Sequence, residues 1–140
     1  MKRTANAHWN GDLKAGKGTI TTQSTVLDQT QYSFNARFAD GVGTNPEELL
    51  GASHAGCFTM AVSAALTQQG IVANDLDTKA TVELDPAAGK ITGITLELTA
   101  AAIDGVSEAQ FTEIAEGAKA NCPISKALSA TPITLQVTYK

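Results

Sequence analysis

The sequence predicts an α+β fold of 140 residues, in which groups of strands alternate with helices. Two observations lead to this prediction. Apolar and polar residues alternate strictly in several short stretches at the start, the middle and the end of the chain, which is typical of strands. Two longer segments between them have the start and stop signals of helices. Strands that pair as hairpins on either side of a helix indicate α+β rather than a doubly wound parallel sheet.

Five stretches show the alternation and are expected to form strands with one buried face, paired antiparallel. They are residues 5–10, 32–38, 79–84, 94–99 and 133–139, with a weaker strand at 18–23. Residues 85–89, Asp-Pro-Ala-Ala-Gly, are predicted to form a turn between two of these strands. Residues 14–18 are expected to join another pair.

A long helix is predicted to start after Asn45. Asn45 can serve as the N-cap, and Pro46 occupies the first helical position, where its missing N–H costs nothing. Glu48 is expected to complete a capping box, and Glu47 and Glu48 both lie at the positive end of the helix dipole. The helix should run to about residue 69, with Gly70 as its stop.

The body of this helix, residues 49–66, is apolar or small on nearly every face. A helix that is apolar all round must be buried all round, and a chain with only 5% aromatic residues has little to cover it. We therefore expect a second subunit on one side of the helix. Polar residues such as Ser53 and Thr59 interrupt the segment, so it is not expected to span a membrane.

The composition limits the function classes further. Apolar residues make up 43% and charged residues 17%, as in a globular domain, and no repeat or linker divides residues 1–140, so we expect a single domain. A net charge of −4 without a basic patch argues against binding to nucleic acid or to an anionic membrane. The first residues lack the apolar stretch of a secretory signal, so a cytoplasmic location is expected.

A second helix is predicted from Ser107, its N-cap, to about residue 121. Its apolar stripe is continued by Cys122, and Pro123 ends it. Residues 123–128 can start a short new helix with Cys122 near its N-cap.

Cys57 and Cys122 are the first candidates for chemistry. Cys57 lies in the long helix and shares a face with Ser53 and His54, although a buried inert thiol is an equally ordinary interpretation. Cys122 is either a stripe residue or a thiol whose ionised form is favoured by the free N–H groups of the next helix. Their separation fits neither a CxxC motif nor a zinc site, and the residues alone do not show whether the two thiols meet. If they do, reversible dithiol–disulfide cycling is the natural chemistry.

Arg37 and Glu47 are charged candidates with two interpretations each. Arg37 falls on the polar side of its predicted strand, either as a solvated charge or as a fixed cation that holds a thiol as thiolate. Glu47 is either a first-turn acid that complements the helix dipole or part of a site. His8 and His54 have no third partner for a hydrolase triad.

Six motifs together resemble the OsmC/Ohr family of thiol-dependent organic hydroperoxide reductases, over essentially the whole chain. The most specific combination is an Asn-Pro-Glu-Glu-Leu block, a cysteine ten residues later, and a distant Cys-Pro. The motifs are AHWNGD at 7–12, GKGT at 16–19, YSFNARF at 32–38, GTNPEEL at 43–49, ASHAGCF at 52–58 and AKANCPIS at 118–125.

The resemblance implies a peroxidase that reduces organic hydroperoxides, and less efficiently hydrogen peroxide, to alcohol and water in oxidative and osmotic stress defence. Cys57 matches the peroxidatic cysteine, which becomes a sulfenic acid, and Cys122 matches the resolving cysteine, which forms a Cys57–Cys122 disulfide. Arg37 matches the activating arginine of the OsmC branch, and Glu47 matches the acid that pairs with it. His54 occurs in that branch only and is left out of the core site.

The resemblance also implies an intertwined homodimer, with antiparallel sheets around two long central helices. It implies no metal and no cofactor. The reductant would be an external dithiol, in the cell a lipoylated protein.

The spacing of Glu47 and Cys57 raises a geometric question. Ten residues of straight helix rise by roughly 15 Å, so Glu47 cannot touch the thiol of its own straight helix. Either the helix breaks near Gly51, or the partner subunit supplies the carboxylate. We expect an active site at the dimer interface.

Two other functions compete with the peroxidase. One is a non-enzymatic dimeric module that binds a ligand or senses redox state through its thiols. The other is a cysteine acyl hydrolase that uses Cys57 and His54.

Overall fold

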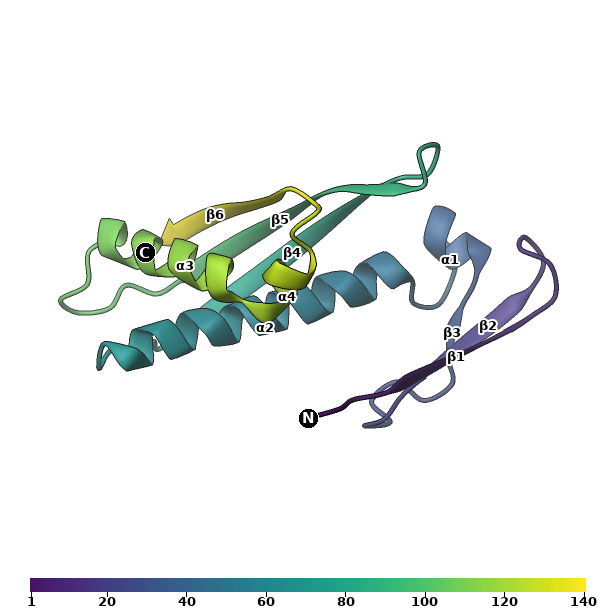
Figure 1. Cartoon of the computed structure of the whole chain (residues 1–140), viewed down its shortest axis with the longest axis horizontal. Helices are drawn as coiled ribbons and strands as arrows, with labels where there is room; N and C mark the ends of the chain where they lie inside the picture. The colour runs from purple at the N-terminus through teal and green to yellow at the C-terminus, as the bar shows by residue number, and fades with distance from the viewer. The chain divides into compact units, whose positions relative to one another are not determined.

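The computed structural model describes all 140 residues, which divide into two compact units, Met1–Leu49 and Leu50–Lys140. The first unit contains β1 (Ala5–Asn10), β2 (Lys17–Thr22), β3 (Thr30–Tyr32), α1 (Phe34–Phe38) and the start of α2 (Pro46–Gln68). The second contains the rest of α2, β4 (Leu76–Asp85), β5 (Lys90–Ala100), α3 (Glu108–Asn121), α4 (Pro123–Ala127) and β6 (Ile133–Tyr139) (Figure 1). The predicted α+β class is confirmed, whereas the single-domain prediction stays a prediction.

The N-terminal unit is built on an antiparallel sheet in the order β1-β2-β3. Trp9 on β1 and Tyr32 on β3 lie on one face of this sheet, with ring centroids 5.3 Å apart. Gly18 lies between them on β2, where a Cβ atom would come within 2.3 Å of the Tyr32 ring. A glycine is therefore needed for the two rings to approach across the central strand.

The predicted strand at 32–38 is wrong after its first residue. The chain leaves β3 at Tyr32 and forms helix α1, whose N-cap Ser33 accepts a hydrogen bond from the N–H of Ala36 at 3.1 Å. Phe34 and Phe38 are four residues apart, and their ring centroids lie 4.8 Å from each other on the helix. This spacing satisfies both a strand alternation and a helical i,i+4 pair, so the pattern alone misled the prediction.

Helix α2 starts as predicted. The Asn45 side chain accepts a hydrogen bond from the N–H of Glu48 at 2.8 Å, and Pro46 is the first helical residue. The capping box is only half formed, because the Glu48 carboxylate accepts from the hydroxyl of Thr44 at 3.3 Å instead of from the N–H of Asn45.

The end of α2 is also as predicted, with Gly70 in the left-handed region at φ +72°. The N–H of Ile71 donates to the carbonyl of Leu66, and the N–H of Gly70 donates to Thr67, both at 3.0 Å. These two bonds form a Schellman motif, in which glycine is favoured because it has no Cβ.

The C-terminal unit has a three-stranded sheet in the order β4-β5-β6 with α2 and α3 packed on one face. Helix α2 contacts β4 through a 2.7 Å hydrogen bond between the hydroxyls of Thr59 and Thr78. Helix α3 contacts β6 through Phe111 and Tyr139, whose rings stack with centroids 4.7 Å apart. The residues that form the core between them are Phe58, Val62, Leu66, Ile94, Leu96, Leu98, Ala100, Phe111, Ile114, Ala115, Ala118 and Cys122.

The antiparallel prediction is wrong for the last strand. β4 and β5 pair antiparallel through the predicted turn at 85–89, but β6 runs parallel to β5. Residues 101–132 form a crossover that carries α3 and α4, and a crossover returns the chain in the same direction. The alternation of β6 reports which face is buried and contains no information on strand direction.

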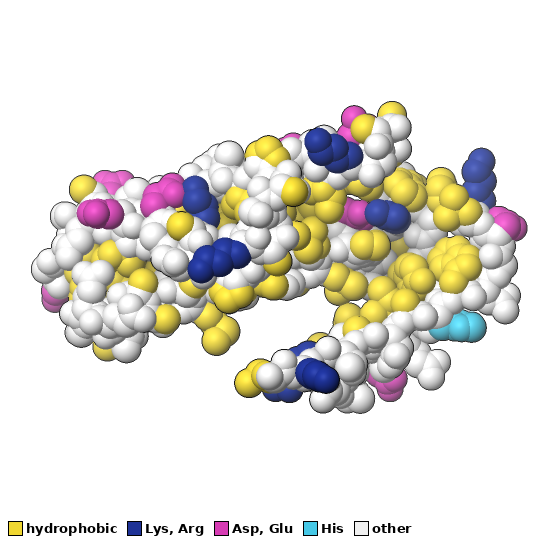
Figure 2. Space-filling model, in the orientation of Figure 1, with side chains coloured by type: hydrophobic (Ala, Val, Ile, Leu, Met, Phe, Trp, Pro, Cys, Tyr) yellow, Lys and Arg dark blue, Asp and Glu magenta, His cyan; other side chains and the backbone are white.

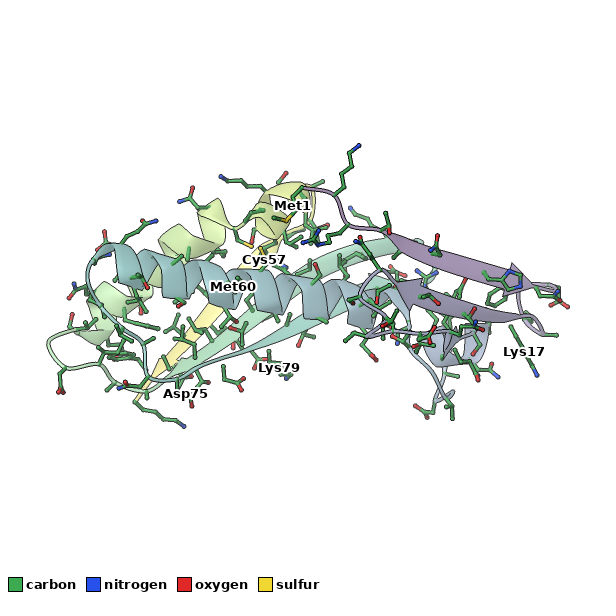
Figure 3. The ribbon with its side chains drawn as sticks, turned by 90° about the horizontal axis from the view of Figure 1, so that it is seen from below. Met1, Lys17, Cys57, Met60, Asp75 and Lys79 are labelled. Atoms are coloured by element: carbon green, nitrogen blue, oxygen red, sulfur yellow. The ribbon has the colours of Figure 1, made fainter.

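Only one stripe of α2 is buried in the single chain: Gly51, His54, Phe58, Val62 and Leu66. Met60, labelled in Figure 3, is 75% exposed on another side of the same helix. Hydrophobic side chains accordingly remain visible on the surface of the molecule (Figure 2). A single chain therefore does not bury α2 on all sides.

By length and composition, α2 could cross a membrane, since its mean hydropathy is 1.4 over an 18-residue window that is 28% buried. The core helix of a soluble protein also meets this criterion, and α2 packs through Phe58, Val62 and Leu66 into the core of the C-terminal unit.

Candidate active site

The structure brings the two cysteines together. Cys57 lies in the middle of α2 and is partly exposed (Figure 3), whereas Cys122 lies between α3 and α4 and is fully buried. Their sulfur atoms are 3.2 Å apart, and both thiols are free. A disulfide would require the two sulfur atoms to approach by only about 1 Å more.

Cys122 occupies the N-cap of α4, where the stripe of α3 and the Asn-Cys-Pro sequence place it. Burial acts to raise its pKa, but the neighbouring N–H of Ser125, the Cys57 thiol, the Ser125 hydroxyl and the N–H of Ile124 together outweigh burial. The pKa of Cys122 is therefore lowered. This agrees with the predicted effect of free N–H groups at the start of the next helix.

Cys57 has the opposite balance. Burial raises its pKa, the N–H of Ile124 opposes this increase, and the neighbouring Cys122 adds to it. A positive charge close to Cys57 would lower its pKa and favour its thiolate.

His54 lies three residues before Cys57 on α2 and is fully buried. Its Nε2 atom is 2.8 Å from the hydroxyl oxygen of Ser125, and its Nδ1 atom has no hydrogen-bond partner. Burial lowers the pKa of His54, so the ring is neutral at neutral pH. Neither ring nitrogen bonds Cys57, and the structure thus lacks the cysteine–histidine pair that an acyl hydrolase needs.

The second predicted pair, Arg37 and Glu47, also forms. Nη2 of Arg37 donates to Oε1 of Glu47 at 2.7 Å, and Nε donates to both carboxylate oxygens at 3.1 and 3.2 Å. The hydrogen bond from Arg37 lowers the pKa of Glu47. The guanidinium carbon lies 5.2 Å from the centroid of the Phe38 ring, which adds a cation–π contact. Arg37 belongs to α1 and not to a strand, which corrects its predicted position.

An apolar pocket of about 280 Å³ lies beside Arg37 within the N-terminal unit. It combines aromatic walls with one guanidinium, so it can accommodate an organic group next to a positive charge. The residues that line it are Trp9, Leu13, Tyr32, Ser33, Phe34, Arg37, Phe38 and Pro46.

Arg37 and Glu47 belong to the N-terminal unit, whereas Cys57 and Cys122 belong to the C-terminal unit. Helix α2 is continuous from Pro46 to Gln68, so the alternative of a break near Gly51 is wrong. Gly51 is buried against β4, where a Cβ would make an ordinary contact at 3.4 Å with the Ala80 carbonyl oxygen. A carboxylate supplied by a partner subunit stays a prediction.

Ser125 is a site residue that the sequence analysis did not find. It is 7% exposed and contacts both His54 and Cys122. The available signal was its position three residues after Cys122 in Cys-Pro-Ile-Ser, where a polar side chain in the first turn of α4 lies near the N-cap.

Comparison with known proteins connects this geometry to a family. The sequence pattern of the OsmC-like protein family matches residues 39–138. The chain is 46% identical to the peroxiredoxin OsmC of Escherichia coli strain K12, over all of this chain and 98% of that protein. It is also 34% identical to the organic hydroperoxide resistance protein OhrB of Bacillus subtilis, over 79% of this chain and 80% of OhrB.

The structural comparison agrees with the sequence comparison. The crystal structure of Bacillus subtilis OhrB superposes with a TM-score of 0.67 at 27% identity and covers 98% of both chains. From these similarities, and with two cysteines held at 3.2 Å, we conclude that the chain belongs to the OsmC-like protein family.

Proposed function

We propose that this protein is a thiol-dependent peroxidase that reduces organic hydroperoxides, and more weakly hydrogen peroxide, to alcohol and water. The observation that carries the proposal is the pair of free thiols 3.2 Å apart, one partly exposed and one buried at a helix N-terminus. The names of the relatives, a peroxiredoxin and an organic hydroperoxide resistance protein, support the same chemistry.

The reaction proceeds in three steps. The Cys57 thiolate attacks the outer peroxide oxygen, the O–O bond breaks, and the alkoxide leaves as alcohol after taking a proton. Cys57 is now a sulfenic acid. The Cys122 thiolate then attacks the Cys57 sulfur, a disulfide forms, and the hydroxyl leaves as water. An external dithiol, in the cell a lipoylated protein, reduces the disulfide by exchange.

The active site in this proposal is shared between two copies of the chain. Cys57 needs a cation because burial raises its pKa, and Arg37, held by Glu47, is the cation that the resemblance assigns. Two observations support a homodimer: only one stripe of α2 is buried, and Met60 is 75% exposed. A second copy would cover these apolar sides and bring its Arg37 to Cys57.

The pocket beside Arg37 is the proposed place for the organic group of the hydroperoxide. Its aromatic walls would bind an alkyl or aryl chain and leave the peroxide oxygens near the guanidinium. We place the protein in the cytoplasm, where a reducing environment keeps such a dithiol available for the next cycle.

The test is multiple-turnover consumption of cumene hydroperoxide with excess dihydrolipoamide. The wild-type protein should consume many equivalents and Cys57→Ser none. Without the dithiol, Cys122→Ser should consume one equivalent and form a sulfenic acid that dimedone traps. Ser129→Ala, an exposed change just after α4, is the control and should behave like wild type. Unchanged turnover in Cys57→Ser would contradict the mechanism. A wild-type protein that stops after one equivalent would favour the non-enzymatic redox sensor.

A further inference from the structure

A buried row of polar groups leads from α2 to the resolving thiol. His54 is completely buried, Ser125 is 7% exposed, and Cys122 is completely buried. The ring Nε2 of His54 lies 2.8 Å from the hydroxyl oxygen of Ser125. Ser125 lies in the first turn of α4, the helix that Cys122 caps, and its side chain is one of the groups that lower the pKa of Cys122. The mechanism given above uses Cys122 and leaves His54 and Ser125 without a role.

The direction of these hydrogen bonds follows from the unpartnered Nδ1 atom of His54. A neutral imidazole has its proton on one nitrogen only. A proton on Nδ1 would be a buried N–H without an acceptor, which is rarer and more costly than a buried acceptor without a donor. The proton therefore lies on Nε2 and is donated to the Ser125 oxygen. The hydroxyl hydrogen of Ser125 is then free to point at the Cys122 sulfur.

We propose that His54 is a positioning residue that, through the hydroxyl of Ser125, holds Cys122 as the thiolate that attacks oxidised Cys57. The proposal rests on the proposed function for its place in the cycle. In that step the S–S bond forms, the S–O bond of the sulfenic acid breaks, and the hydroxide that leaves takes a proton from solvent. Cys122 sulfur is oxidised and Cys57 sulfur is reduced, while His54 neither gives nor takes a proton.

A role of His54 as general base is less compatible with the structure. Protonation would place a charge on a buried ring and add an N–H at Nδ1 with no acceptor. Burial also lowers the pKa of His54, which opposes the same change.

Few other charges act on the resolving thiol. From α2, the titratable groups that face Cys122 are Cys57 directly and His54 through Ser125. On α3, Lys119 is paired with Glu116 at 2.7 Å, and on α4 Lys126 is exposed. The Ser125 hydroxyl is thus a contact that a single substitution can remove without altering a nearby charge.

The experiment measures attack by Cys122 without any peroxide. Dithiodipyridine labels the more accessible Cys57 and releases one thiopyridone, and Cys122 then displaces the second. The rate of this second release is followed by stopped flow from about pH 6 to about pH 10. The variants are Ser125→Ala, His54→Leu, His54→Gln and the pair His54→Leu with Ser125→Ala, with the exposed Ser129→Ala as control.

Ser125→Ala and His54→Leu should each slow the second release about threefold near pH 6. If the pKa of Cys122 rises by about one unit, tenfold less thiolate is present, but each thiolate is about threefold more reactive. The slowing should vanish near pH 10, where the Cys122 thiol is ionised in the variants as well as in the wild-type protein. The double variant should be no slower than Ser125→Ala. His54→Gln retains a donor at this position and should stay close to wild type.

Wild-type rates in Ser125→Ala near pH 6 would overturn the proposal. So would a slowing that is the same at every pH, which indicates a structural defect, or a His54→Gln variant as slow as His54→Leu, which indicates a base. Because the assay contains no peroxide, failure of the proposed function would be visible separately, as absence of hydroperoxide turnover by the wild-type protein.

Discussion

The core of Leu50–Lys140 buries the inward-facing positions of β5 almost completely, whereas β1 of Met1–Leu49 leaves five of its six residues exposed. The same contrast applies to the reactive groups of each unit. Cys122 is fully buried beside Cys57, but the Arg37 side chain is 38% exposed where it pairs with Glu47. The thiols are therefore placed by a core that one chain completes alone.

The charge pair depends on a weaker scaffold. A three-stranded sheet needs a packed face to be stable, and the N-terminal sheet has few buried residues of its own. This difference shows that the contact between the two thiols and the activation of Cys57 depend on different parts of the molecule. The core of a single chain places the thiols, and in our proposal a second copy activates Cys57.

The largest effect should come from the core of the C-terminal unit. Leu96→Ala removes a fully buried side chain from β5, and we expect it to lower the free energy of unfolding by about 2–5 kcal/mol. Val26→Ala, at a position 85% exposed in the N-terminal unit, should change it by less than about 0.5 kcal/mol. Urea unfolding measures both. If the two variants lost equal amounts of unfolding free energy, the proposed difference in packing between the two units would be contradicted.

An intermediate effect should come from the charge pair. Arg37→Ala should slow the first oxidation of Cys57 by cumene hydroperoxide about tenfold at neutral pH, because the thiol loses its cation and its pKa rises. Arg37→Lys keeps the charge but loses the two-pronged contact with Glu47, so it should recover part of the rate. Single-turnover trapping of the sulfenic acid in a Cys122→Ser background gives these rates. A normal rate in Arg37→Ala would show that the two units do not cooperate.

The smallest effect should be the stability that Glu47 contributes. Arg37 holds the pKa of Glu47 below its ordinary value of 4.5, so the unfolded chain takes up a proton first as the pH falls. The stabilisation is therefore complete above that ordinary value and is lost as the pH falls through the lowered pKa. Since Arg37 is partly exposed, we expect at most about 1 kcal/mol.

Urea unfolding of wild type and Glu47→Gln at several pH values tests this sign. The two proteins should differ at neutral pH and converge in acid. A difference that grows in acid would contradict the assignment of the pair.

Much of the fold could be predicted because the patterns are local. The strand at 133–139 and the helix caps at Asn45 and Ser107 were found from alternation and capping residues that act within a few positions. The prediction of a strand at 32–38 is wrong because Phe34 and Phe38 also fit a helix once Ser33 caps it. The predicted direction of β6 is wrong because the direction depends on the crossover and not on the residues of β6.

The site was predictable only in part, for a related reason. The thiols, Arg37 and Glu47 were candidates from their surroundings and from the family resemblance, but contact between cysteines 65 residues apart depends on how α3 packs on the sheet. A role for Ser125 can be inferred only from its contact with the buried His54. No pattern along the chain reveals that contact.

The central claim is that Arg37 of one copy activates Cys57 of the other, and mixed dimers test it most directly. Arg37→Ala and Cys57→Ser chains with different tags are produced together, and dimers with both tags are isolated. If Arg37 acts across the interface, each mixed dimer has one intact site and should show about half of the wild-type hydroperoxide turnover. Turnover no higher than that of the Arg37→Ala protein would contradict the account.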